Sequence, residues 1–145
     1  MVKSMSDDYQ PKIIALVCNW CTYTAADLAG TSRLSYPANI RMIRMMCTGM
    51  IDPKYILKAF LDGADGVFIG GCHPGDCHYI NGNLKFKKRM AGMESIISQF
   101  GFEEDRLRLR WIGASEGPEF QHNMTDFIQT IQNMGPSPAQ GLMVL

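Results

Sequence analysis

The middle of the chain reads Gly66-Val67-Phe68-Ile69-Gly70-Gly71-Cys72-His73-Pro74-Gly75-Asp76-Cys77-His78-Tyr79, where a short apolar run meets a loop of glycines, cysteines and histidines. The run Gly66–Ile69 predicts a buried strand that ends at the glycine pair. The glycines and the Pro74–Gly75 step predict a tight, irregular turn after it. Because backbone amides in such a turn can hydrogen-bond thiolates, the loop suits an anionic metal centre.

Three other segments have the composition of strands, and helical patterns lie between and after the four. The expected strands are 12–17, 40–46, 66–69 and 107–112, and the expected helices are 22–28, 53–62, 83–100 and 117–134. Strands that alternate with helices predict an α/β fold with a parallel sheet, right-handed crossovers and helices on both faces. We expect the strand order 2-1-3-4, as in flavodoxin-like and Rossmann-like folds.

The expected helices carry local start, stop and core signals. Asp52–Pro53 is an N-cap followed by proline at the first helical position. The stretch Gly30-Thr31-Ser32 is expected to break the first helix, and glycine at 63, 101 and 135 to end the others. The expected core-facing residues of the two long helices are Met90, Met93, Ile97 and Phe100, then Phe120, Met124, Phe127, Ile128 and Ile131. Because Leu107–Ile112 alternates polar and apolar residues, it is expected at an edge.

The length of 145 residues fits one domain. We expect a loose tail at 1–11, a single α/β domain at 12–135 that contains all five cysteines, and a second tail at 136–145. The 14 basic and 14 acidic residues balance, which argues against a general nucleic-acid or membrane-surface binder. The sequence contains neither a run of apolar residues long enough to span a membrane nor a signal-peptide pattern, so we expect a cytoplasmic protein.

The five cysteines are expected to meet at one corner of the sheet. Cys18, Cys47 and Cys72 each follow the carboxyl end of an expected strand, and Cys21 and Cys77 lie a short turn further on. In the order 2-1-3-4 the three strands are neighbours, about 4.8 Å apart. Their carboxyl ends form the edge where open α/β sheets bind ligands. Thiols stay reduced in the cytosol, so we interpret the cysteines as ligands or redox groups and not as disulfides.

Three kinds of site fit this corner. Cys18-x-x-Cys21 alone would suit a thioredoxin-like dithiol, and thiolates also bind zinc. A 2Fe–2S cluster needs four of the five cysteines, which leaves one surplus that the residues do not identify. We expect His73 and His78 to orient the loop or bond to sulfur, and not to replace thiols.

The first half of the expected helix 83–100 is basic, with Lys85, Lys87, Lys88 and Arg89 close together. Such a run is usually a solvated face. The alternatives are a docking surface, or charge compensation for an anionic cofactor.

The combined motifs resemble a known family, the delta (iron–sulfur) subunit of methyl-viologen-reducing nickel–iron hydrogenase. The resemblance rests on Cys18-Asn19-Trp20-Cys21, Tyr36-Pro37 with Ile40-Arg41 and Cys47, Ala64-Asp65-Gly66-Val67, Gly71 to Tyr79, and Gly82-Asn83. It runs from about Lys12 to Phe127, nearly the whole chain. The loop from Gly71 to Tyr79 together with the upstream Cys-Asn-Trp-Cys is its most specific part.

The resemblance implies an electron-transfer subunit of methanogens with one 2Fe–2S cluster and no substrate site of its own. It implies ligands from Cys18, Cys21, Cys47, Cys72 and Cys77. It implies partners as well: a nickel–iron hydrogenase or a formate dehydrogenase upstream, and the flavoprotein subunit of heterodisulfide reductase downstream. That complex reduces ferredoxin and the mixed disulfide of coenzymes M and B by flavin-based electron bifurcation, as part of methanogenesis. A thiol–disulfide protein and a zinc-stapled interaction module remain the alternatives.

Overall fold

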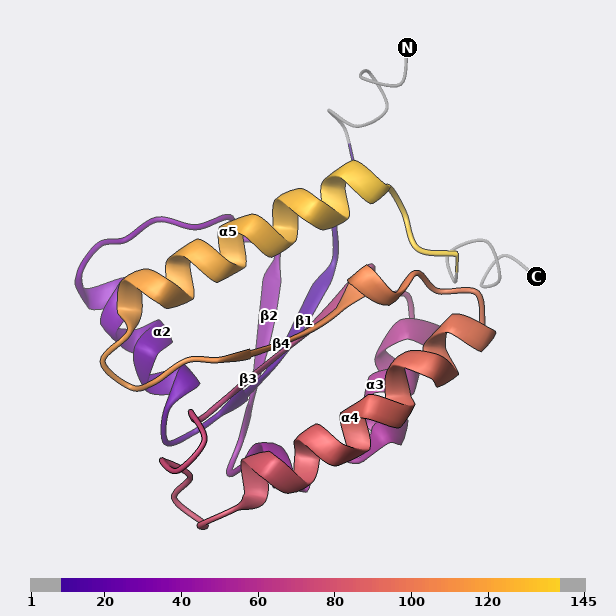
Figure 1. Ribbon diagram of the computed structural model, residues 1–145. Helices are drawn as coiled ribbons and strands as arrows, with labels where there is room; N and C mark the ends of the chain where they lie inside the picture. The colour runs from indigo at the N-terminus through magenta and orange to yellow at the C-terminus, as the bar shows by residue number, and fades with distance from the viewer. Residues whose placement is uncertain (1–8, 139–145) are drawn as a thin grey trace.

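The computed structural model describes residues 9–138, which fold around one parallel sheet (Figure 1). Its strands are β1 (Ile13–Cys18), β2 (Ile40–Met45), β3 (Gly66–Gly71) and β4 (Leu107–Trp111), in the order β2-β1-β3-β4. This confirms the predicted fold class and strand order. The observed strand ends differ from the predicted ones by one or two residues.

The two central strands are apolar because they are covered on both faces. All six residues of β3 are buried, and so are five of the six in β1. The edge strands differ: β2 is mostly exposed, and β4 is buried fully only at Leu107. The predicted edge position of the fourth strand is therefore confirmed.

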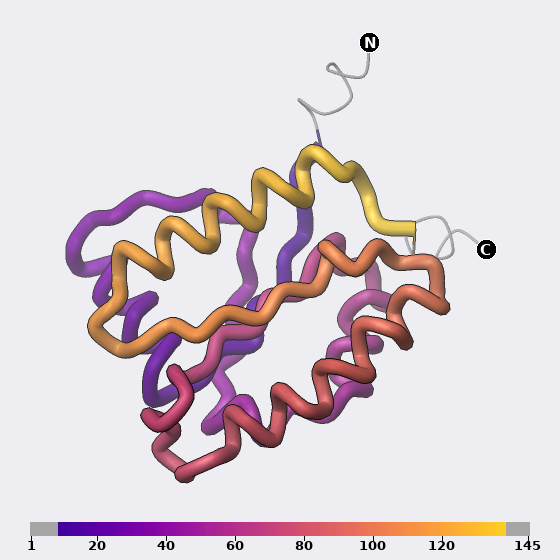
Figure 2. Tube along the Cα trace, viewed as in Figure 1, coloured from indigo at the N-terminus to yellow at the C-terminus, as the bar shows by residue number. Residues whose placement is uncertain are grey.

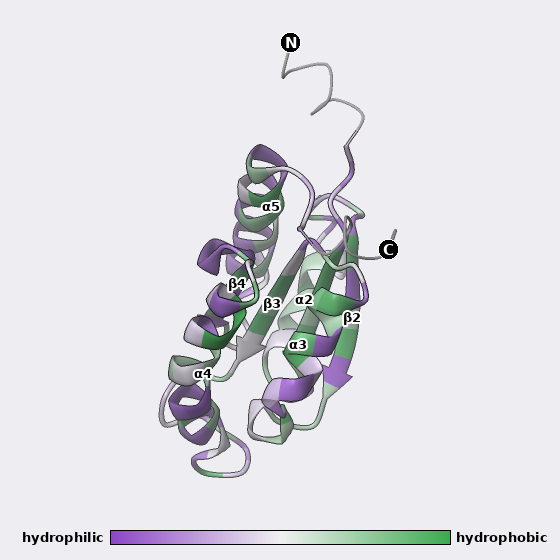
Figure 3. Ribbon diagram, turned by 90° about the vertical axis from the view of Figure 1, so that its right-hand side faces the viewer, coloured by the Kyte–Doolittle hydropathy of each residue, from purple (hydrophilic) through white to green (hydrophobic). Residues whose placement is uncertain are grey.

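Two helices cover each face of the sheet (Figure 1). The helices α2 (Thr22–Thr31) and α5 (Gly117–Met134) lie on one face, and α3 (Pro53–Leu61) and α4 (Gly82–Gln99) lie on the other. Short 3₁₀ turns, η1 (Thr48–Met50) and η2 (Glu104–Arg106), precede α3 and β4. Apolar residues gather on the strands and the inner helix faces, while polar residues gather on the outer faces of α4 and α5 (Figure 3).

Most predicted helix signals hold in the structure. The Asp52 side chain accepts a hydrogen bond from the Lys54 amide, with Pro53 in the first turn. The predicted core residues of α5 are all buried, and Met90, Met93 and Ile97 of α4 are buried as well.

One prediction about the helices was wrong. Phe100 was expected in the core but is 53% exposed, because α4 ends one residue earlier and Phe102 fills the core instead, 4.9 Å from the Phe60 ring.

The first helix ends inside the predicted break, at Thr31 with Ser32 as its C-cap, three residues later than the predicted helix. The chain then reverses at Arg33, whose φ is 58°.

A buried arginine organises the end of the sheet opposite the cysteines. Arg106 is 1% exposed, and its guanidinium donates to the Asp65 carbonyl and to the carbonyls of Gly135 and Pro136. It also pairs with Glu103. The Asp65 carboxylate accepts hydrogen bonds from the amides of Lys12 and Ser137. A buried charge with this many partners is satisfied, and the network links residue 12 and residues 135–137 to the starts of β3 and β4.

The predicted tails at 1–11 and 136–145 lie mostly outside the described residues. Within the described part, the Tyr9 hydroxyl donates to the Gly135 carbonyl at 3.2 Å, and Ser137 is buried. No helix in residues 9–138 is long and apolar enough to cross a membrane.

Candidate metal centre

The loops that follow β1, β2 and β3 meet at one end of the sheet (Figure 2). Cys18 closes β1, Cys21 is the N-cap of α2, and Cys47 precedes η1. Cys72 follows β3 directly, and Cys77 lies in the loop before α4. All five cysteines are free thiols, and only Cys77 is more than slightly exposed.

Three of the thiols form one tight group. The Sγ atoms of Cys18, Cys21 and Cys72 all lie within 4.8 Å of one another. The Cys18–Cys72 separation is 3.7 Å, and the Cys21–Cys72 separation is 2.8 Å. Cys18 closes β1 and Cys72 directly follows the adjacent strand β3, so the sheet sets the spacing of these two, while Cys21 is held at the start of α2.

The other two thiols form a pair, with 3.7 Å between the Sγ atoms of Cys47 and Cys77. The pair joins the loop after β2 to the loop after β3. Burial raises the pKa of Cys47 most, and the contact with Cys77 raises it further against the lowering by the Gly49 amide. Cys18 Sγ lies 3.8 Å from the Met46 carbonyl oxygen, so it is close to the residue that precedes Cys47.

The thiol group of three gives up one proton easily and resists losing the others. Hydrogen bonds from Cys21 and Cys72 lower the pKa of Cys18 to about 3. The same contact with Cys18 raises the pKa of Cys21 to about 12, and the pKa of Cys72 is also raised well above its ordinary value. Further deprotonation of such buried sulfurs requires a cation beside them, and a bound metal supplies that charge.

Backbone amides surround the sulfurs, as the loop sequence predicted. The Gly49 amide donates to Cys47 Sγ at 3.3 Å. Although burial raises the pKa of Cys77, the amides of Asn83, Tyr79 and Gly82 lower it below its ordinary value. The amides of Trp20 and Cys21 lower the pKa of Cys18. These donors favour thiolates over thiols and suit an anionic centre.

Two glycines allow close approach around the cysteines. A methyl group at Gly82 would overlap the Cys47 sulfur and would lie 3.5 Å from the Cys77 sulfur. A methyl group at Gly70 would meet the hydroxyl of Thr22 at 2.8 Å. Glycine at 82 therefore leaves the space that Cys47 occupies, and glycine at 70 lets α2 pack against β3.

The two predicted histidines contact other loops, and neither has a hydrogen bond to sulfur in residues 9–138. His73 pairs with Glu116, whose carboxylate also accepts the Gly113 amide at 2.7 Å. The Gly113 amide and then His73 lower the pKa of Glu116. The His78 ring stacks on Trp20, with ring centroids 3.8 Å apart and planes at 10°. A role in orienting the loop thus agrees with both positions and stays a prediction.

Sequence reasoning missed the side chains that support the cysteine loops. Asn83 is buried, and its Nδ2 donates to the carbonyls of Cys72 and His73 at 2.8 and 3.1 Å. Arg89 was considered only as part of a basic run, yet it donates to the carbonyls of Gly49 and Ile51. Glu116 directly precedes the expected helix 117–134 and was given no role. For Asn83 a sequence signal was available, because this polar residue directly follows Gly82, the glycine at which α4 begins.

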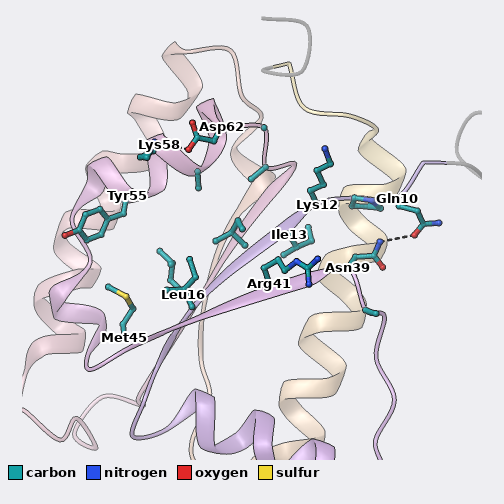
Figure 4. Close-up of a pocket in the computed structure, with 17 residues that line it drawn as sticks. Gln10, Lys12, Ile13, Leu16, Asn39, Arg41, Met45, Tyr55, Lys58 and Asp62 are labelled. Carbon is teal, nitrogen blue, oxygen red and sulfur yellow. Dashed lines mark hydrogen bonds and ion pairs between the residues drawn. The ribbon is translucent and has the colours of Figure 1, made fainter. Parts of the chain in front are cut away.

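A separate groove of about 940 Å³ lies between the β1–β2 edge and α3 (Figure 4). Its walls include Ile14, Leu16, Ile43, Met45 and Tyr55, and none of the five cysteines lines it. Its one acidic lining residue among residues 9–138, Asp62, forms an ion pair with Lys58, and its other charged lining residues are Lys12 and Arg41. The groove therefore carries no chemistry comparable to that of the cysteine corner.

The sequence matches the family described as methyl-viologen-reducing hydrogenase, delta subunit, over residues 13–135. The chain belongs to this family. The matched range contains every strand, every helix through α5 and all five cysteines. The predicted resemblance is thereby confirmed.

Relatives of this delta-subunit family member are of two kinds. The chain is 52% identical to the iron-sulfur subunit of the vhc F420-non-reducing hydrogenase of Methanococcus voltae, covering 91% of this chain and 92% of that protein. It is 46% identical to the F420-non-reducing hydrogenase iron-sulfur subunit of Archaeoglobus profundus, covering 91% and 96%. It is also 47% identical to part of one subunit of the ferredoxin:CoB-CoM heterodisulfide reductase of Methanosarcina mazei, covering 87% of this chain but 16% of that protein.

Proposed function

We propose that this delta-subunit chain is an electron-transfer subunit of an oxidoreductase complex and carries one 2Fe–2S cluster. The observation that carries the proposal is the convergence of five reduced thiols at one end of the sheet, in two groups. When bound, such a cluster accepts and gives one electron at a time. The chain supplies the ligands, the surrounding amides and the cover from water.

The sulfur spacings support a particular ligand set. Two thiolates on one tetrahedral metal, with bonds of about 2.3 Å, lie about 3.8 Å apart. The pairs Cys18–Cys72 and Cys47–Cys77 are both 3.7 Å apart, so each pair suits one iron. Cys21 lies 2.8 Å from Cys72, which is shorter than this tetrahedral edge. We therefore take Cys21 as the surplus cysteine.

Two further features fit a group larger than a single ion. The Thr48 hydroxyl is buried and has no hydrogen-bond partner in the described part of the chain, and it lies next to Cys47. A buried hydroxyl without a partner is costly, and an inorganic sulfide nearby would accept its hydrogen bond. The amides on Cys18, Cys47 and Cys77 would likewise balance the negative charge of a thiolate-bound cluster.

The relatives support particular partners. Some carry the name of a hydrogenase iron-sulfur subunit, and others contain the same domain within a larger chain of heterodisulfide reductase. A domain that is separate in one complex and fused in another supports direct contact between the two proteins. We propose that electrons arrive from a nickel–iron hydrogenase or a formate dehydrogenase and leave to the flavoprotein subunit of heterodisulfide reductase, for flavin-based bifurcation in the cytoplasm of a methanogen.

The partner proposal is tested by isolating the untagged chain from its source under anaerobic conditions and measuring its native mass. We expect all of it in a complex that contains a flavoprotein and a hydrogenase or formate dehydrogenase. A neutral chain with weak diffusive steering is poorly suited to shuttle freely. A chain found only as a free monomer would contradict the proposal.

A further inference from the structure

Exposed apolar side chains gather over the cysteine end of the sheet. They are Trp20, Met46, Met50, Tyr79 and Ile80, which we name the cysteine-end patch. Met46, Met50 and Tyr79 line one hollow of about 400 Å³ with Cys47, and the Trp20 indole lies 3.4 Å from the Tyr79 hydroxyl. Contiguous exposed apolar side chains of this size mark interaction sites.

Ile80 is the most exposed member of the patch and the most strained. It is 83% exposed, and its φ is 74°, in the left-handed region that β-branched residues avoid. Its amide bonds the Cys77 carbonyl at 3.0 Å, which closes the turn that brings Cys77 to the site. Since the Ile80 side chain is almost fully in water, its packing within this chain does not offset the cost of the left-handed backbone angle. Strain of this kind is typical of functional surfaces.

The hollow of the patch is basic on one side. Lys85 is its charged lining residue, while the exposed Asp76 lies in the same loop as Ile80 and does not line the hollow. Arg89 is turned inward, toward the carbonyls of Gly49 and Ile51. Among residues 9–138, no acidic residue lines the hollow. A partner that fits this side of the hollow therefore presents carboxylates beside an apolar centre.

We infer that the cysteine-end patch is the docking surface for a redox protein partner, which receives Ile80 in an apolar pocket and faces Lys85 with acidic side chains. The inference rests on the proposed electron-transfer function. The hollow is lined by Cys47, and its neighbour Cys77 is the least buried of the five cysteines, so electrons have the shortest path to a partner here. An anchor residue beside that path would bring the two redox centres together.

The test uses an Ile80→Asn variant of the iron-loaded full chain. Asparagine tolerates left-handed backbone angles, so the thermal midpoint of the isolated chain is expected to rise. The dissociation constant for the purified heterodisulfide reductase and hydrogenase subunits of the source organism is expected to increase about tenfold or more for one of them. Ile96→Asn is the matched control, since Ile96 is 41% exposed on α4 and lies outside the patch. It should leave binding unchanged.

A second variant tests the charged side of the hollow. Lys85→Gln should slow association several-fold at low salt, and the difference should vanish at high salt. Iron content, measured on every variant, shows whether the site itself is intact.

The outcomes separate this inference from the proposed function. Normal iron content and wild-type affinity in Ile80→Asn would overturn the docking surface and leave the electron-transfer role standing. A lowered thermal midpoint in Ile80→Asn would overturn the argument from strain. A wild-type chain that lacks iron, or that binds neither partner, would overturn the proposed function and the docking surface with it.

Discussion

Replacing Cys72 by serine is expected to abolish the visible spectrum of the anaerobically purified protein and to remove most of its iron. Cys72 follows a fully buried central strand, which fixes its position, and it lies 3.7 Å from Cys18, the spacing that suits one iron, so the substitution removes one ligand of that pair. Serine keeps the size of the side chain, but its hydroxyl is not ionised at neutral pH, and thiolates are the ligands that such clusters need. Absorption and iron analysis of the same sample measure the effect.

Cys21→Ser is the matched control, because it makes the same chemical change within the same thiol group. We expect it to keep most of its iron and its spectrum, since Cys21 lies outside the two pairs spaced at 3.7 Å. Cys18→Ser, Cys47→Ser and Cys77→Ser should behave like Cys72→Ser. A normal spectrum in Cys72→Ser would show that the site has been placed wrongly. Loss of iron in Cys21→Ser together with retention in another variant would change only the ligand set.

Replacing Gly82 by alanine is expected to damage the site without removing any cysteine. The new methyl group would overlap the Cys47 sulfur, and the backbone of Gly49 lies 3.8 Å away on the same side. Either Cys47 turns away or the start of α4 shifts, which also moves Cys77. We expect loss of most of the iron, and a cost of roughly 1–3 kcal/mol in the free energy of unfolding of the metal-free chain from overpacking.

Gly92→Ala provides the control for this change in the same helix. A methyl group at Gly92 meets no atom of the described chain within 4 Å, so the variant should keep its iron. It should also gain about 0.5–1 kcal/mol of stability, because alanine is the better helix former. Urea unfolding and iron analysis report both quantities. Full iron content in Gly82→Ala would contradict the packing described for Cys47.

The fold could be predicted from the sequence because its signals are local and agree with one another. Apolar runs such as Gly66–Ile69 identify the buried strands, and the Asp52–Pro53 start of α3 follows from capping chemistry alone. The core prediction failed after α4, where two aromatic residues lie close together in the sequence and either Phe100 or Phe102 could fill the same space.

The gathering of the cysteines was predictable for the same reason, because parallel strands place their carboxyl ends together. Their division into three and two was not, since it depends on how the loops after β2 and β3 fold. The contact of Arg89 with the Gly49 carbonyl and that of Glu116 with His73 join segments 40 and 43 residues apart, and no local pattern predicts them. Our proposal that Cys21 is the surplus cysteine rests on the distances between sulfur atoms, which the sequence does not provide.

The two alternative sites make different demands on the thiols. A thioredoxin-like dithiol would pair Cys18 with Cys21, yet the shortest separation joins Cys21 to Cys72 of another strand. A zinc ion would suit the group of three with one further ligand, but would leave at least one of Cys47 and Cys77 without a partner. A 2Fe–2S cluster uses both groups at once.

Iron, zinc and acid-labile sulfide, measured per chain on protein purified anaerobically, test this account most directly. We expect about two irons and two sulfides per chain, no stoichiometric zinc, and a red-brown colour from thiolate-to-iron charge transfer. About four of each would indicate a cubane cluster and the wrong cluster type. One zinc without sulfide, or a colourless metal-free dithiol, would contradict the electron-transfer function itself.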